Sequence, residues 1–178
     1  QLATGGATQV ISTDHLRALI HDPAEMARIA AVHALGDIWA MGAQPQAALS
    51  SIILPHMSPA LQSRTLGEIT AAANDVFSRA GATIVGGHTT MGAEMTIGFT
   101  VTGTCTSSPI SLSGAQAGDV LVLTQPIGSG VLMAAHMEGS ARGADVAQVL
   151  AEMTQLQDRQ AFHLRHAHSM TDVTGFGL

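Results

Sequence analysis

One segment near the amino end carries both a start signal and a stop signal for a helix, and it constrains the fold more than any other. Asp22 is a suitable N-cap, Pro23 stands at the first helical position, and Glu25 follows in the first turn. Gly42 is a typical residue just after a last helical turn. We therefore expect a helix from Pro23 to about Met41.

The face of this helix that repeats every three or four residues is mostly apolar, so it should pack against the core. Asp37 falls on that face, one turn after His33, and a buried charge has to be paired or bound to a metal. The residues alone leave two interpretations open: an aspartate that caps or pairs with a neighbour, or one that binds a ligand. The full stripe is Met26, Ile29, Ala30, His33, Asp37, Ala40 and Met41.

Two stretches on either side of this helix have the composition of strands. Residues 8–13 are rich in β-branched side chains and should deliver Asp14 and His15 to a following loop. Residues 46–54 form a second strand pattern, closed by Pro55. A second helix is expected from Ser58-Pro59 to Gly81, with an inner face made of Leu61, Thr65, Ile69, Ala72, Val76 and Ala80.

Residues 94–103 alternate more regularly than any other stretch, which predicts a strand with two different faces. Its second face is small and hydroxylated rather than charged, so we expect it inside a barrel or against another copy of the protein. Cys105 should be a small buried residue at the end of this strand. One face carries Met95, Ile97, Phe99 and Val101, and the other carries Thr96, Gly98, Thr100 and Thr102.

A further strand pattern, residues 83–85, continues directly into paired glycines. The residues that follow, Gly86-Gly87-His88-Thr89-Thr90, are a candidate loop whose backbone amides could face an anion or a nucleotide. Paired glycines also occur in simple tight turns. The sequence leaves both possibilities open at this point.

Residues 106–118 are rich in Ser and Gly and mark the expected domain boundary. Beyond it, residues 119–124 predict a short buried strand, and residues 131–138 and 144–167 predict helices. The second of these helices should end in three histidines, which we interpret as a solvated helix end rather than as a metal site. They are His163, His166 and His168.

Composition excludes several classes of protein. The net charge is −6 and there is no lysine, so a nucleic-acid surface is not expected. No apolar run is long enough to span a membrane. A single cysteine rules out an internal disulfide framework, which is typical of the cytoplasm. We therefore predict a soluble cytoplasmic protein.

The last nine residues place Asp172 between two threonines, and two glycines follow within five residues. Such an aspartate could hold a metal bound to phosphate oxygens. Together with Asp14 and Asp37 it forms a set of oxygen ligands without sulfur, which favours a hard cation such as Mg²⁺. Spacing alone predicts no more than a nucleotide or phosphate site.

Four segments together resemble one enzyme family. They are Ser12–Asp14, Ala27–Gly42 (ARIAAVHALGDIWAMG), Gly81–Thr89 (GATIVGGHT) and Met170–Leu178 (MTDVTGFGL). In register they resemble selenophosphate synthetase (selenide, water dikinase), of the superfamily of aminoimidazole ribonucleotide synthetases. The resemblance implies an α+β (α/β two-layer) fold. An N-terminal sheet-and-helix domain over residues 1–106 would pair with its copy into a dimeric β-barrel. Residues 107–118 would be a linker, and residues 119–178 would begin a second α/β domain.

The resemblance also implies a reaction and its ligands. The family converts ATP, selenide and water to selenophosphate, AMP and orthophosphate, and its members are homodimers. Asp37 and Asp172 match aspartates that bind Mg²⁺ near the ATP phosphates, and Asp14 matches an acidic residue that contacts nucleotide and metal. A monovalent cation is a further candidate cofactor. Three further residues match a loop of the family that contacts the nucleotide and reaches toward the other subunit's site. They are Gly87, His88 and Thr89.

Two features depart from the family pattern. The glycine-rich segment with the expected Cys or selenocysteine and Lys would precede residue 1, so we expect no catalytic residue in this sequence and no catalysis by it alone. His33 stands where these enzymes usually carry Asn. Two alternatives stay open. One is another enzyme of the superfamily, of the purine-pathway or hydrogenase-maturation type, and the other is a non-catalytic nucleotide-binding dimerisation module.

Overall fold

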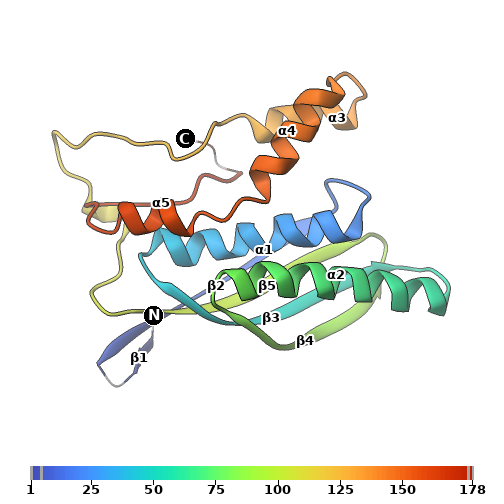
Figure 1. The fold of residues 1–178 in the computed structure, drawn as a ribbon, viewed down its shortest axis with the longest axis horizontal. Coiled ribbons are helices and arrows are strands. Elements are labelled where there is room, and N and C mark those ends of the chain that lie inside the picture. Colours follow the sequence, from blue (N-terminus) through green and yellow to red (C-terminus); the bar gives the residue numbers. More distant parts are fainter. Residues whose placement is uncertain (1, 5, 176, 178) are drawn as a thin grey trace.

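The computed structural model of the chain describes residues 2–4, 6–175 and 177. All strands and the two longest helices lie before residue 106, and beyond it the regular elements are helical (Figure 1). The elements are β1 (Leu2–Thr4), β2 (Ala7–Arg17), α1 (Pro23–Ala40), β3 (Gln44–Pro55), α2 (Pro59–Arg79), β4 (Thr83–Gly92), β5 (Thr96–Cys105), the short 3-10 helix η1 (Leu112–Gly114), α3 (Ser129–Met137), α4 (Gly143–Met153) and α5 (Asp158–His163).

The strands form one sheet in the order β1-β2-β5-β3-β4. Neighbouring strands are antiparallel except β3 and β4, which are parallel and joined through α2. This connection agrees with the rule that parallel neighbours need a crossover, usually a helix. The expected α+β two-layer class is confirmed.

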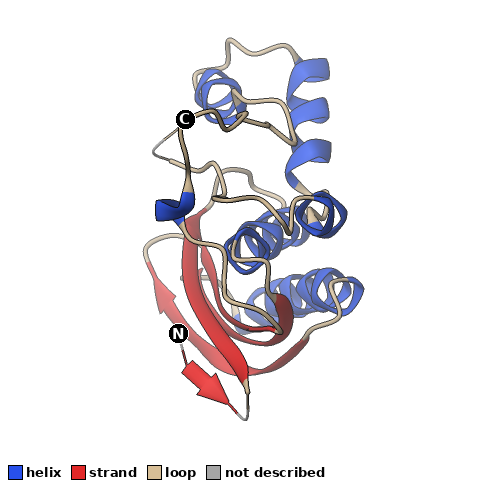
Figure 2. Ribbon diagram, turned by 90° about the vertical axis from the view of Figure 1, so that its left-hand side faces the viewer, coloured by secondary structure: helices blue, strands red, loops and turns tan. Residues whose placement is uncertain are grey.

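Helices α1 and α2 cover the same face of the sheet, and no helix of the described residues covers the other face (Figure 2). The core lies between these two layers. Phe99 of β5 and Phe77 of α2 are both fully buried, and their rings meet edge to face with centroids 5.0 Å apart. Such pairs add to the free energy gained from burial alone. The predicted inner face of α2 is confirmed for Thr65, Ile69 and Val76, whereas Leu61 is exposed because it lies in the first turn.

Both predicted ends of α1 are confirmed. The Asp22 side chain accepts a hydrogen bond of 2.8 Å from the Glu25 amide, and Pro23 opens the helix. Gly42 has a φ of 68°, a left-handed conformation that glycine adopts without strain. The helix is buried on more sides than its apolar stripe predicted, because the C-terminal helices α4 and α5 also contact it.

Strand β5 confirms the alternating pattern, with Ile97, Phe99 and Val101 buried on the helix side. Cys105 ends the strand and is buried, as expected. Its thiol lies 3.7 Å from the Met41 carbonyl oxygen. Burial raises the pKa of this thiol, so it stays protonated at neutral pH.

Two expectations for the second half of the chain differ from the structure. Residues 119–124 form no strand, and Val120 and Leu121 are 83% and 91% exposed. The helix expected over residues 144–167 is interrupted after Met153 and resumes as α5. Among the described residues, no helix is both long enough and apolar enough to cross a bilayer. The proposed division into two domains and a linker stays a prediction.

Candidate functional site

Three aspartates from distant parts of the sequence lie together beside α1. Asp14 comes from β2, Asp37 from α1, and Asp172 from the segment after α5. After burial, the charge of Asp37 is a cause of the raised pKa of both other carboxyl groups, so Asp37 lies close to each of them. Asp172 lies against Gly36, since a Cβ built on Gly36 would be 3.7 Å from the Asp172 Cβ. The structure thus unites the three predicted acidic residues.

The strand β2 determines where Asp14 points. Val10, Ser12, Asp14 and Leu16 alternate with more exposed residues, so this set faces the helices. The prediction that Asp14 follows a strand in a loop is therefore wrong, because β2 continues to Arg17 through its pairing with β5. A position inside a paired strand holds the carboxylate more rigidly than a loop would.

Two further side chains belong to this cluster. The Ser12 hydroxyl donates a short hydrogen bond to Oδ2 of Asp37. His33 Nε2 lies 3.8 Å from Oδ1 of Asp14, and both side chains are half-buried. Ser12 was not predicted as a site residue, although its spacing of two from Asp14 in a strand puts both side chains on one face.

The cluster carries more negative than positive charge. Burial and then the neighbouring Asp37 raise the pKa of Asp14 to about 6. Burial, followed by the charge of Asp37, also raises the pKa of Asp172. His33 is the group that opposes these shifts at both carboxyl groups through its charge. A bound cation would relieve the same repulsion.

The donors fit a hard cation in kind, because they are carboxylate and hydroxyl oxygens. Within residues 2–4, 6–175 and 177, however, no three His, Cys, Asp or Glu side chains stand close enough as placed to hold an ion. Binding an ion would require the carboxylates to draw together. Ionised carboxylates repel one another until a cation is present.

The structure does not bring the predicted glycine loop to this cluster. Gly87, His88 and Thr89 lie inside the edge strand β4, so the expected loop is wrong. Pairing runs from Asp14 to Phe99, then to Ser50, then to Gly87, three strands away. At the usual spacing between strands this is roughly 14 Å.

Gly87 has a packing reason to be glycine. A Cβ at this position would overlap the carbonyl group and hydroxyl of Ser50 on β3. The neighbouring Gly86 meets only the Leu49 side chain, at an ordinary contact distance of 3.6 Å. The paired glycines therefore do not by themselves indicate a ligand.

Among the described residues, the three histidines expected at the end of the second C-terminal helix belong to no group that could hold a metal ion. His163 ends α5, and His166 follows in a turn. His168 Nδ1 lies 2.8 Å from Oδ1 of Asp119, in an exposed pair. All three histidines are exposed, in agreement with their interpretation as a solvated helix end.

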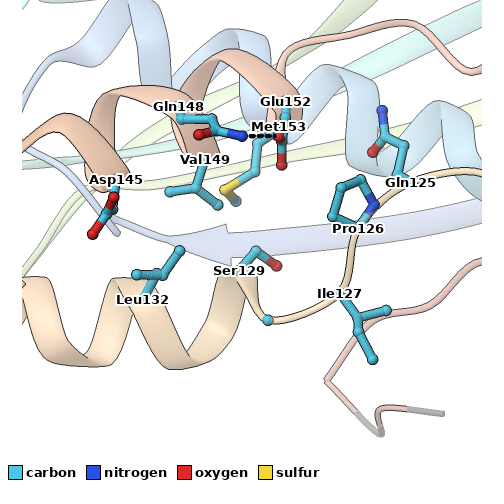
Figure 3. Close-up of a pocket in the computed structure, with 11 residues that line it drawn as sticks. Gln125, Pro126, Ile127, Ser129, Leu132, Asp145, Gln148, Val149, Glu152 and Met153 are labelled. Carbon is cyan, nitrogen blue, oxygen red and sulfur yellow. Dashed lines mark hydrogen bonds between the residues drawn. The ribbon is translucent and has the colours of Figure 1, made fainter.

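A cavity of about 230 Å³ lies elsewhere, between the segment that enters α3 and helix α4 (Figure 3). Pro126, Leu132 and Val149 form its apolar wall, and Gln148 donates a hydrogen bond of 2.9 Å to Glu152 beside it. None of the three clustered aspartates lines this cavity. It is therefore separate from the acidic site.

Comparison with known sequences identifies the family of this α+β protein. Residues 2–105 match the model of the AIR synthase related protein, N-terminal domain, and residues 116–178 match its C-terminal domain. The chain belongs to the AIR synthase related family.

Curated relatives in this family are named selenide, water dikinase. The relative from Desulfitobacterium hafniense is 38% identical over 96% of this chain and 51% of its own length. The relative from Trichlorobacter lovleyi is 41% identical over 88% of this chain and 45% of its own length. The chain thus spans about half the length of the curated relatives it matches.

Solved structures share the fold at low identity. Thiamine-monophosphate kinase from Stenotrophomonas maltophilia has a TM-score of 0.82 at 18% identity, over 97% of this chain and 58% of that one. The hydrogenase maturation protein HypE in complex with ATP has a TM-score of 0.66 at 21% identity, over 82% and 45%. This likeness shows the fold alone.

Proposed function

We propose that this chain supplies the cation and nucleotide site of a selenide, water dikinase. The enzyme would convert ATP, selenide and water to selenophosphate, AMP and orthophosphate. The single observation that carries the proposal is the convergence of Asp14, Asp37 and Asp172, which matches the order of acidic residues that the family resemblance implied. The relatives named selenide, water dikinase support the same assignment.

In this proposal the three aspartates hold Mg²⁺ against the ATP phosphates. Mg²⁺ would supply the positive charge that allows acidic side chains and phosphates to share a site. Asp37 stands in the middle and contacts the ion, Asp14 approaches from the sheet, and Asp172 approaches from the C-terminal segment. Ser12 orients Asp37 by its hydrogen bond. A monovalent cation is a further candidate in the same region.

Titration of ATP with Mg²⁺ tests the binding step. Replacing Asp37 with Asn removes the central negative charge at nearly constant size, so we expect affinity to fall at least about tenfold. Asp75→Asn is the matched control, because Asp75 is an exposed carboxylate on α2 that pairs with Arg79. Equal heat signals for wild type and Asp37→Asn in calorimetry would contradict a role for Asp37.

The reaction itself is tested on the full-length protein. Incubation with ATP, Mg²⁺ and selenide should release AMP only when selenide is present. Consumption of ATP that does not depend on selenide would instead support another enzyme of the superfamily. Binding of ATP without any turnover would support the non-catalytic dimerisation module.

We also propose a homodimer that forms through the uncovered face of the sheet. On that face Thr100 and Thr102 of β5 lie beside Leu49 and Ile11, which are 49% and 51% exposed. Pairing with a second copy would bury this face in a β-barrel. Strand β4 lies far from the acidic cluster of its own subunit. In the dimer it could instead bring Gly87, His88 and Thr89 near the nucleotide bound by the other subunit.

Sedimentation tests this arrangement. We expect a dimer at micromolar concentration, and we expect Leu49→Arg to shift it toward monomer because a charge would be buried in the interface. Ala71→Arg is the matched control, since Ala71 is exposed on α2, which covers the opposite face of the sheet. A monomeric wild type well above micromolar concentration would contradict the proposed dimer.

The cytoplasmic location expected from the sequence stays a prediction.

A further inference from the structure

The Ser- and Gly-rich segment between residues 106 and 118, expected to be a linker, is fixed to the end of α1 at its start. The Ile110 amide donates a hydrogen bond of 3.1 Å to the Met41 carbonyl oxygen. The Ile110 side chain packs over Gly42, 3.2 Å from where a Cβ on that glycine would lie. The segment therefore begins from a defined place on the N-terminal core.

The same segment then contacts residues 168–169, just before Asp172. The Ser169 hydroxyl donates a hydrogen bond of 3.1 Å to the Leu112 carbonyl oxygen. Gly114 lies so close to the backbone of His168 that a Cβ would overlap the His168 carbonyl oxygen and approach its carbonyl carbon to 2.9 Å. Only glycine permits this approach, because the obstacle is backbone and cannot rotate away.

A third contact closes this arrangement. Asp119 accepts a hydrogen bond of 2.8 Å from the Gln116 amide through one oxygen, and its other oxygen lies 2.8 Å from His168 Nδ1. We name residues 110–119 the strap. Its contacts hold residues 168–169, and three residues later the chain places Asp172 against Gly36 on α1.

We propose that the strap positions Asp172 in the acidic site and that Gly114 is the positioning residue. Gly114 acts through the backbone of His168. A side chain at position 114 pushes residues 168–172 away from α1 and takes the Asp172 carboxylate with it. The consequence for ligand binding rests on the proposed cation site, whereas the positioning itself does not.

The positioning is tested without any ligand by disulfide trapping. The Cβ separation of 3.7 Å between positions 36 and 172 suits a disulfide. Gly36→Cys with Asp172→Cys, in a Cys105→Ser background that removes the single native cysteine, should cross-link readily. Adding Gly114→Ala should slow cross-linking at least about tenfold. Gly130→Ala is the matched control, since nothing lies within 4 Å of its added methyl group, and it should leave the rate unchanged.

A double-mutant cycle tests the functional consequence, with Mn²⁺ and ATP as the probes. Gly114→Ala should weaken binding at least about fivefold in wild type and by less than about twofold in an Asp172→Asn background. General damage to the fold would instead weaken binding equally in both backgrounds. His168→Ala serves as a milder variant, and His168→Asn should restore binding, because the Asn amide can donate to Asp119 from nearly the same position as Nδ1.

The outcomes separate the two proposals. Equal cross-linking rates with and without Gly114→Ala overturn the strap. If Gly114→Ala slows cross-linking but the wild-type protein binds neither Mn²⁺ nor ATP, the strap is supported and the proposed function is overturned. Slower cross-linking together with equal loss of affinity in both backgrounds overturns the step from the strap to the site.

Discussion

Strand β5 and residues 120–123 are both apolar strand-like segments, yet the structure uses them in opposite ways. Phe99 of β5 is fully buried, with β2 on one side and β3 on the other. Leu121 is 91% exposed and belongs to no sheet of the described residues. A strand is stable only where partners pair its backbone and cover its face. The apolar pattern therefore specifies what can be buried, and the partner strands decide whether it is.

The largest difference between the two segments should appear in their contribution to stability. Phe99→Ala removes a buried ring and leaves a cavity, so we expect a loss of about 3–5 kcal/mol in the free energy of unfolding. Leu121→Ala should change it by less than about 0.5 kcal/mol. Urea denaturation followed by circular dichroism measures both. A costly Leu121→Ala would show that residues 120–123 are buried in solution.

A smaller effect should separate the two adjacent glycines of β4. Gly87→Ala forces a methyl group against the Ser50 backbone, so we expect a cost of about 1–3 kcal/mol from overpacking. Gly86→Ala meets only the movable Leu49 side chain and should cost less. Thermal unfolding of both variants gives the difference. Equal stability would leave the glycine pair without a packing explanation and favour a ligand-binding role.

Asp14 should make stability depend on pH in the opposite sense to an ordinary paired carboxylate. Its pKa in the folded chain, about 6, lies above the ordinary 3.8, so ionisation opposes folding. In buffer free of divalent cations, stability should decline as the pH rises from about 4 through about 6. Asp14→Asn should flatten this decline and gain about 1–2 kcal/mol at pH 8, after allowance for partial exposure.

Thermal melting across this pH range measures the effect. Asp75→Asn should keep the wild-type slope, because that carboxylate is exposed and outside the cluster. Added Mn²⁺ should remove the decline in wild type and should change the already flat profile of Asp14→Asn much less. An identical slope in Asp14→Asn and wild type would contradict the assigned cause.

The smallest effect is expected at the exposed pair of Asp119 and His168. The Gln116 amide and then His168 lower the pKa of Asp119, so any stabilisation is present above the ordinary carboxyl pKa and is lost as the pH falls through the lowered value. Salt screens such a pair. Asp119→Asn should leave the melting temperature unchanged at about 0.5 M salt and lower it slightly in dilute buffer. A large loss of melting temperature at high salt would indicate that the pair of Asp119 and His168, rather than Gly114, positions Asp172.

Much of the N-terminal fold could be predicted from the sequence because its signals are local. The Asp22 cap, Pro23 and Gly42 act within one or two turns of the residues they affect, and α1 begins and ends where they indicate. The alternation in β5 likewise depends only on the geometry of a single strand. These predictions needed no knowledge of distant contacts.

The sequence by itself determined the identity of the acidic residues and the helix face on which Asp37 lies. The tertiary structure alone decided that Asp14 sits within a paired strand, that Gly87 lies three strands from it, and that Asp172 returns to α1 beneath the strap. Each of these depends on contacts between residues far apart in the chain. Local sequence patterns describe a residue's surroundings over a few positions and carry no information about which distant segment arrives beside it.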